Sequence, residues 1–151
     1  MRARGHTAVM EDHAPAEVEA DSPEQALFRR LNYFPTAPWA ARAGGELIAV
    51  KLDPGAWTCE DPACGEGHMV HGLAPYFDQV VASDIHAYDP ARLAAIGRAA
   101  ARQDFLSDDW RWNGRGEAPD WIVTNPPFAH AAEFVRLGLE RARRGVAVIA
   151  R

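Results

Sequence analysis

Short apolar runs that end in polar, turn-forming residues recur along this chain and predict strands. Four of them cover residues 57–60, 79–84, 121–124 and 146–150. The last run is apolar throughout, which is typical of a strand buried on both faces of a parallel sheet. The first and third runs each break into a loop, so these two loops are expected at the carboxyl ends of strands.

Helices are expected between these runs. Residues 22–25 read Ser-Pro-Glu-Gln, with a serine N-cap, a proline in the first turn and a glutamine three residues after the cap. Thr36 is suited to cap a second helix over about 37–43, which Gly44-Gly45 would end, and residues 46–52 fit either a helix or a strand. Further helices are expected over residues 68–73, 91–100 and 129–144, the last of them amphipathic.

The loop after residues 121–124 reads Asn125-Pro126-Pro127-Phe128 and carries hydrogen-bond acceptors. Its prolines have a fixed φ and no N–H, so the loop is rigid and its carbonyl oxygens are free to accept. Asn125 adds a side-chain acceptor. Two acceptors that converge on one point suit a planar amino group, such as an exocyclic base amine or a carboxamide, and Phe128 offers a flat face for stacking.

The loop after residues 57–60 reads Asp-Pro-Ala-Cys-Gly-Glu-Gly over residues 61–67. Gly65 and Gly67 allow the backbone to turn sharply and to approach a ligand just before a helix. Asp61 and Glu66 make this loop acidic, which disfavours a pyrophosphate and suits a cationic ligand. The absence of a G-x-G-x-x-G pattern here disfavours a dinucleotide oxidoreductase.

The two loops together resemble the class I S-adenosylmethionine-dependent methyltransferases that methylate amino nitrogens. This group includes adenine-N6 DNA methyltransferases, guanine-N2 ribosomal RNA enzymes and glutamine-N5 enzymes. The resemblance implies an α/β, Rossmann-like fold with helices on both faces of a mostly parallel sheet in the order 3-2-1-4-5. It also implies S-adenosyl-L-methionine as cofactor and no metal.

The resemblance assigns roles to individual residues around the cofactor. Asp84 lies about 20 residues after the glycine loop, at the end of the next run, where a carboxylate can accept hydrogen bonds from ribose hydroxyls. Asp104 would accept from the adenine amino group, although Asp108 and Asp109 lie close by. The aromatic-Pro-Thr segment at residues 34–36 would close over the methionine end of the cofactor. The alternative is that this segment is an ordinary capped turn. The expected cofactor-binding residues are Phe34, Pro35, Thr36, Asp61, Ala63, Cys64, Gly65, Gly67, Asp84, Ile85, Asp104, Phe105 and Asn125; the expected catalytic residues are Asn125, Pro126, Pro127 and Phe128.

Composition is compatible with this interpretation. The chain has 151 residues, of which 48% are hydrophobic, enough for one globular domain. Residues 1–21 lack apolar periodicity and are expected to form a disordered tail before a domain over 22–151. The family continues past its fifth strand, so the last strands of the domain are expected to be missing. No apolar run is long enough to cross a membrane, and a cytoplasmic location is expected.

The cysteines, the histidines and the net charge add little to the prediction of function. Cys59 and Cys64 are expected to be reduced thiols that pack in the interior. His68 and His71 are three residues apart without a suitable third ligand, so a structural or exposed role is expected. The formal net charge of −5 disfavours a protein whose whole surface grips nucleic acid, but it allows a local basic face.

The expected function is transfer of a methyl group to adenine N6 in DNA, which makes DNA the expected partner. Two alternatives stay open: an amino methyltransferase that acts on RNA or on a protein glutamine, and a truncated, non-catalytic remnant that binds cofactor. In the expected mechanism Asn125 and the Pro126 carbonyl aim the amine at the methyl group, with Phe128 against the substrate plane. A base in duplex DNA would first have to be flipped out.

Overall fold

The computed structural model of this chain describes residues 22–30, 34–89, 91 and 100–149. The tail expected over residues 1–21 lies outside the described residues. So does nearly all of the helix expected over residues 91–100.

Five parallel strands form one sheet in the order β3-β2-β1-β4-β5, which confirms the expected topology. The expected strands are present almost as predicted, and a short third strand precedes the loop that carries Asp104. Because all five strands run the same way, their carboxyl ends meet at one edge, where the two loops identified in the sequence lie side by side. The strands are β1 (Thr58–Asp61), β2 (Gln79–Asp84), β3 (Ala100–Arg102), β4 (Trp121–Thr124) and β5 (Gly145–Val148).

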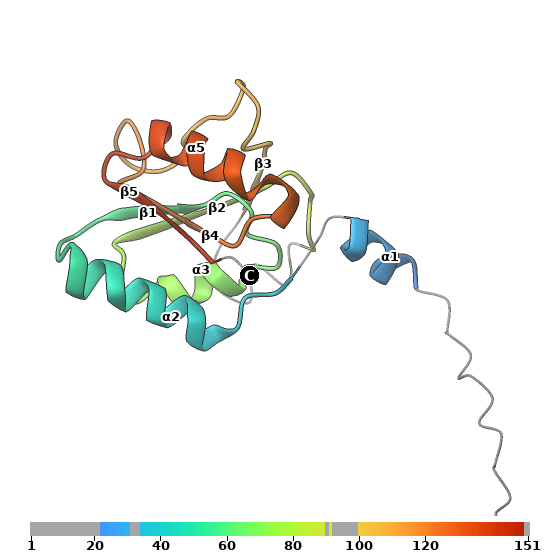
Figure 1. Ribbon diagram of the computed structural model, residues 1–151, viewed down its shortest axis with the longest axis horizontal. Coiled ribbons are helices and arrows are strands. Elements are labelled where there is room, and N and C mark those ends of the chain that lie inside the picture. Colours follow the sequence, from blue (N-terminus) through green and yellow to red (C-terminus); the bar gives the residue numbers. More distant parts are fainter. Residues whose placement is uncertain (1–21, 31–33, 90, 92–99, 150–151) are drawn as a thin grey trace, which may run out of the picture.

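Helices cover both faces of this sheet (Figure 1). On one face lie α2 (Pro38–Glu46), which continues into a π-helical segment η1 (Leu47–Leu52), and α3 (His68–Leu73). On the other lies α5 (Ala131–Arg141), which follows a 3-10 turn, η2 (Phe128–His130). The first helix, α1 (Pro23–Arg30), begins with the expected capping box: the Ser22 N–H donates to Gln25 Oε1 (2.8 Å) and the Gln25 N–H donates to Ser22 Oγ (3.2 Å).

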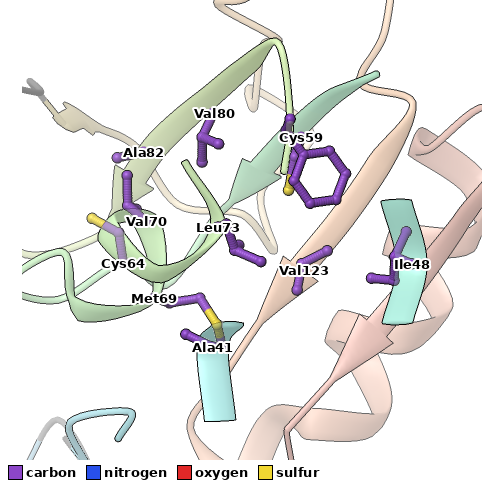
Figure 2. Close-up of a cluster of buried hydrophobic side chains, with 11 residues drawn as sticks. Ala41, Ile48, Cys59, Cys64, Met69, Val70, Leu73, Val80, Ala82 and Val123 are labelled. Atoms are coloured by element: carbon purple, nitrogen blue, oxygen red, sulfur yellow. The ribbon is translucent and has the colours of Figure 1, made fainter. Parts of the chain in front are cut away.

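The larger core lies between the sheet and the α2–α3 layer (Figure 2). Alternate strand residues point into it, which is why Cys59, Val80 and Val123 all belong to this core. Both cysteines are buried and free, as expected. A smaller core on the α5 face contains Phe105, Ile122, Phe134 and Leu137.

The register between the first strand and the fourth is supported by a side-chain pair. Thr58 donates from both its N–H and its hydroxyl to Asp120 Oδ2, each at 3.0 Å, and the Asp120 N–H donates back to Thr58 Oγ1 (3.1 Å). These bonds align the starts of β1 and β4, so the two loops at their far ends are brought to the same level.

The second helix departs from expectation at both ends. Gly44 and Gly45 do not end it; the helix runs through Glu46 and continues to Leu52, which also decides between helix and strand for residues 46–52. Gly45 is buried in contact with Tyr76, where a Cβ would come within 2.5 Å of the ring, so this glycine serves close packing. Thr36 does not cap the helix: the N-cap is Ala37, without a side-chain bond.

Two expectations near the end of the chain are also corrected. The helix expected over residues 129–144 ends at Arg141, because Ala142 is already extended, and Gly145 begins β5 rather than capping the helix. The residues of β5 are half-buried, not buried on both faces. In the described sheet β5 pairs with β4 alone, so less of its surface is covered than in a central strand.

Candidate active site

One pocket of about 450 Å³ lies at the carboxyl ends of the strands, and most of the residues expected from the sequence line it. This volume is in the range of small-molecule and cofactor sites. The three expected segments that come together here are far apart in the chain: the 34–36 segment, the glycine loop, and the loop after β4. The expected residues on its wall are Phe34, Pro35, Thr36, Asp61, Ala63, Cys64, Asp84, Ile85, Asp104, Phe105, Asn125 and Pro127.

Four expected residues are not on the wall of the pocket. Gly65 and Gly67 have φ values of 52° and 87°, which side chains rarely adopt, so they shape the turn that leads into α3. Pro126 is buried. Phe128 is half-buried, and its ring stacks on that of the lining residue Phe34 at 5.2 Å between centroids.

Asp84 joins the end of β2 to the glycine loop. Its Oδ2 accepts from the Gly65 N–H (3.0 Å) and its Oδ1 accepts from the His86 N–H (2.9 Å). Burial raises the pKa of this carboxyl, and the two backbone N–H groups oppose the rise in pKa. The side chain is therefore held in one orientation, with acceptor lone pairs left for a ligand.

Asp61 presents a carboxylate oxygen that lacks a partner. Its Oδ1 accepts from the Thr124 hydroxyl (2.8 Å) and from the Ala63 N–H (3.3 Å), whereas Oδ2 is buried with no hydrogen-bond partner among the described residues. Burial is the main cause that raises the pKa of Asp61 to about 7; the hydrogen bonds from Thr124 and Ala63 oppose this rise, and the nearby carboxylates of Asp84 and Glu60 contribute to it. A buried, unpartnered acceptor beside a second carboxylate suits a cationic or N–H-bearing ligand.

Asn125, at the end of β4, has its amide oriented by the 34–36 segment. Its Nδ2 donates to the Phe34 carbonyl (2.8 Å) and to the Thr36 hydroxyl (3.2 Å). A flipped amide would place Oδ1 against the Phe34 carbonyl, two acceptors facing each other, so the neighbours determine the orientation. Oδ1 is then the part of the side chain left to accept from a ligand.

The turn after β3 supplies the remaining wall. Asp104 Oδ1 accepts from the Leu106 N–H (2.8 Å), which tightens the turn, and the Phe105 ring is buried beneath it. Arg141 of α5 donates to the carbonyls of Phe105 and Ser107 and lies over the rings of Phe105 and Trp110, at 4.9 and 4.7 Å from their centroids. This turn is thus attached to α5 as well as to the sheet.

Some residues near the site were not expected from the sequence. Glu60 is fully buried on the α5 face, where its Oε1 accepts from Ser83 Oγ (2.7 Å) and from Trp110 Nε1 (3.2 Å). Burial raises its pKa to about 7. The only signal in the sequence was its place between Cys59 and Asp61 in a strand, because alternate side chains of a strand point to opposite faces of the sheet. Further lining residues that were not expected are Pro62, His68, Met69, Tyr88, Leu106, Ala129, His130 and Phe134.

Arginines near the end of α5 are engaged with carboxylates. Arg143 pairs with Asp120 at 3.5 Å, and Arg144 pairs with Asp53 and lies 3.7 Å from the centroid of the Trp57 ring. Arg144 lowers the pKa of Asp53. These pairs lie at the amino ends of the strands, away from the pocket, so they do not form a phosphate-binding face beside it.

The described part of the chain shows neither a metal-binding cluster nor a membrane-spanning helix. Residues 22–30, 34–89, 91 and 100–149 contain no group of three or more His, Cys, Asp or Glu side chains that could hold a metal ion. None of the helices in these ranges is both long and apolar enough to span a bilayer.

Comparisons with known proteins identify the fold. No family model and no curated protein matches the sequence. Among solved structures, the chain is similar to the methyltransferase subunit of a type I restriction-modification system from Streptococcus thermophilus, with a TM-score of 0.57 and 14% identity over 83% of this chain. It also matches a sugar N-methyltransferase from a Streptoalloteichus species, with a TM-score of 0.44 and 21% identity over 88% of this chain.

This chain spans only part of those proteins, 37% of the first and 51% of the second. At such low identity the likeness concerns the arrangement of strands and helices. The sheet order and the helices on both of its faces therefore give this chain the Rossmann-like fold of the methyltransferases.

Proposed function

We propose that this chain is the cofactor-binding and catalytic part of an S-adenosylmethionine-dependent methyltransferase that acts on an exocyclic amino nitrogen. The observation that carries the proposal is the position of Asn125. Its Oδ1 is left as an acceptor beside a pocket whose wall includes Asp84 and the unpartnered carboxylate oxygen of Asp61.

The residues of the pocket fit this cofactor, which carries the transferable methyl group on a positively charged sulfur. Asp84 would accept from the ribose hydroxyls, and the Asp61 carboxylate would attract the cationic methionine end. Ile85 and Phe105 would lie along the adenine ring, and Asp104 would accept from its amino group. Phe34, Pro35 and Thr36 would close the site near Asn125, to which two of them are already hydrogen-bonded.

Transfer itself would depend mainly on positioning. Asn125 Oδ1 and the Pro126 carbonyl would accept the two N–H groups of the amine, so that the nitrogen lone pair points at the methyl group. Phe128 would stack on the plane of the substrate. A strong base is not needed before attack, because the nitrogen sheds its proton once it has been methylated.

We favour adenine N6 in DNA as the acceptor and DNA as the partner. Support comes from the Asn-Pro-Pro-Phe sequence and from the fold that this chain shares with the methyltransferase subunit of a type I restriction-modification system. An RNA base or a protein glutamine offers the same planar amine, and a non-catalytic remnant would keep only the cofactor site. The acceptor assay below separates these candidates.

Calorimetric titration of the purified chain tests the cofactor site without a known substrate. We expect saturable binding of S-adenosylmethionine and S-adenosylhomocysteine, and none of NAD. A folded chain that binds neither methionine-derived ligand contradicts the proposal. Transfer of a labelled methyl group is then assayed on DNA, RNA and a glutamine peptide; binding without transfer to any of the three would favour the remnant.

A further inference from the structure

An exposed apolar face lies on the outer side of α2, away from the sheet. The continuous helix over residues 38–52 has one buried side, where Ala41 and Ile48 belong to the larger core. On the opposite side Trp39 is 71% exposed and Leu47 is 52% exposed. In Figure 1 α2 lies along the outside of the molecule, with the sheet on its inner side.

The exposed apolar residues of this helix form one stripe. They recur at intervals of three or four residues, the spacing that puts side chains on the same face of a helix. We call this set the outer stripe; it consists of Trp39, Ala43, Leu47 and Val50. The side of a surface helix that faces water is ordinarily polar, so an apolar stripe on that side indicates contact with another molecule.

Two opposite charges beside the outer stripe do not pair with each other. Arg42 and Glu46 are exposed and four residues apart on the same helix, yet neither forms an ion pair or a hydrogen bond through its side chain with any described residue. The same spacing on α5 does give a pair, between Arg136 and Glu140 at 2.8 Å. Arg42 and Glu46 therefore remain available to charges on another molecule.

The outer stripe and its two charges are complementary to themselves. Consider a second copy of the chain that lies antiparallel, related by a two-fold axis beside residues 44–45. Trp39 then lies opposite Val50 of the second copy, and Arg42 lies opposite Glu46 of the second copy. Each of these contacts occurs twice, because in a two-fold interface both copies offer the same patch. One axis thus satisfies the apolar residues and the charges together.

We propose that the outer stripe of α2 is a docking surface for a second copy of this chain, in an antiparallel helix pair with two-fold symmetry. Trp39 supplies the largest apolar contact, and each Arg42 pairs with Glu46 of the other copy. A lipid bilayer or a nucleic acid fits this surface less well, since either would bring phosphates against Glu46. None of these residues lines the pocket, so this inference goes beyond the proposed function and does not depend on it.

The pairing is expected to be weak, because one exposed helix face offers a small contact area. Interfaces at the low end of the size range belong to transient complexes. We expect a Kd on the order of 10–100 µM for the pair of copies. Sedimentation velocity of the purified chain over about 5–500 µM should therefore show a passage from monomer to dimer.

Two charge-reversal variants test whether positions 42 and 46 face each other across the axis. Arg42→Glu and Glu46→Arg each bring like charges together in a pair of identical copies, so each variant alone should dimerise at least about tenfold more weakly. In an equimolar mixture of the two variants, every contact between positions 42 and 46 again joins opposite charges. The mixture should dimerise within about threefold of the unmodified chain.

Arg136→Glu is the matched control for charge reversal. It places two glutamates four residues apart on the exposed side of α5, as Arg42→Glu does on α2, but it lies outside the outer stripe. Dimerisation of this variant should stay within about twofold of the unmodified chain.

Trp39→Ala tests the apolar part of the outer stripe. Loss of this large exposed ring should weaken dimerisation by at least about tenfold. Circular dichroism and urea denaturation verify that each variant is folded. If Trp39→Ala does not fold, Leu47→Ala takes its place, since Leu47 is also an exposed member of the stripe.

Three outcomes overturn the proposal. A chain that stays monomeric up to about 500 µM would mean that the outer stripe meets a different protein. A mixture of the charge variants that associates no better than its components would mean that positions 42 and 46 do not face each other. Dimerisation that survives the loss of the apolar side chain in a folded variant would mean that the copies meet through another surface.

Discussion

Among single residues, Asn125 shows how distant neighbours set the chemistry of a side chain. Its motif supplies an amide, which could present either an oxygen or a nitrogen to a ligand. The choice is made by Phe34 and Thr36, whose acceptors take up the Nδ2 protons from about 90 positions earlier in the chain. The oxygen is left as an acceptor for an amino group.

Replacing Asn125 should separate transfer from cofactor binding. In the Asn125→Ala variant we expect methyl transfer to fall by about 100-fold or more, because an acceptor that positions the amine is lost. S-Adenosylmethionine affinity, measured by calorimetry, should change by less than about threefold, because the cofactor's other contacts supply most of its binding free energy. Asn113→Ala, at an exposed asparagine in the loop before β4, should change neither quantity. Equal losses of transfer and of affinity would contradict the role given to Asn125.

Asp61 should make cofactor binding depend on pH. Because burial raises its pKa to about 7, the free carboxyl is partly protonated at neutral pH, and a cationic ligand requires it to be ionised. We expect S-adenosylmethionine to bind about tenfold more weakly at pH 6 than at pH 8, with proton release at pH 6 in calorimetry in buffers of different ionisation enthalpy.

The Asp61→Asn variant should bind weakly and with little dependence on pH. The exposed Asp78 provides the control, since Asp78→Asn should keep the pH dependence of the unmodified chain. An affinity that is the same at pH 6 and pH 8 would show that Asp61 is already ionised in the free protein.

The sequence predicted most single residues of the pocket. Two short motifs place some of them at strand ends, and the others, such as Phe34 and Asp104, were assigned by the resemblance to a family. It did not reveal Glu60, whose partner Trp110 lies 50 residues away and is on a loop. Nor did it show that the Thr36 hydroxyl would bond to Asn125 rather than cap a helix. Contacts between residues so far apart leave no local pattern.

At the level of elements, α2 shows why a pair of glycines is ambiguous. Two glycines after an apolar stretch commonly end a helix. Here the helix continues, since Gly45 gives room for the Tyr76 ring and Gly44 lies inside the helix with nothing within 4 Å of a Cβ position. Close packing can require a glycine as strictly as a turn does.

Alanine at these two positions should have opposite effects on stability. Gly45→Ala should lower the free energy of unfolding by about 1–3 kcal/mol, because its Cβ would clash with the Tyr76 ring. Gly44→Ala should raise it by about 0.5–1 kcal/mol, because alanine favours the helix and meets no neighbour. Urea denaturation of both variants checks this pair of predictions. A stabilised Gly45→Ala variant would show that Tyr76 moves aside freely.

The contact between α5 and the turn after β3 should support the adenine side of the pocket. Arg141→Gln removes a guanidinium that bonds two carbonyls of this turn and covers two rings. We expect a loss of about 2–3 kcal/mol in unfolding free energy and weaker binding of S-adenosylhomocysteine.

Arg136→Gln on the same helix is the comparison for Arg141. Arg136 forms an exposed pair with Glu140 at 2.8 Å, so its loss should cost about 0.5 kcal/mol or less. If the two variants were equally stable in urea, the bonds to the turn would contribute nothing measurable.

Elements with one strong local signal were predictable. The apolar runs defined β1, β2, β4 and β5, though not the short β3, and a serine-glutamine pair marked the start of α1, where the capping box forms. The end of α5 was placed three residues too late, because its arginine-rich turn looked helical. Two of these arginines instead reach Asp120 and Asp53 elsewhere in the molecule.

At the scale of the whole molecule, the order of strands was predictable only by resemblance to a family. Apolar runs locate four of the five strands, but several orders would place the two loops at one edge of a parallel sheet. The chosen order depends on long-range pairings, such as that between Thr58 and Asp120. In the sequence, the residues that make these pairings look like any other turn or strand residues.

The stability of the whole molecule should fall as the pH rises from about 5 to 8. Glu60 and Asp61 both have a pKa of about 7 in the folded chain, raised by burial above the value in the unfolded chain. The folded state therefore binds more protons in this window, so its stability is greatest on the acid side and is lost as the pH rises through about 7. One such group accounts for at most on the order of 3 kcal/mol.

Urea denaturation of the Glu60→Gln variant should show a flatter dependence on pH than the unmodified chain. Glu140→Gln, which alters an exposed glutamate on α5, should leave the dependence unchanged. An unmodified chain that grows more stable between pH 5 and 8 would indicate that these carboxyls are ionised at the lower pH.

The position of β1 in the middle of the sheet has a consequence for the speed of folding. One edge of β1 pairs with β2, about 20 residues ahead, but the other pairs with β4, about 60 residues ahead. Closing so long a loop costs entropy before the pairing returns any stability, and parallel strands offer no hairpin as a nucleus. During synthesis on a ribosome, β1 would therefore remain open along one edge until β4 has emerged, and that interval is when the nascent chain is most exposed to misassembly.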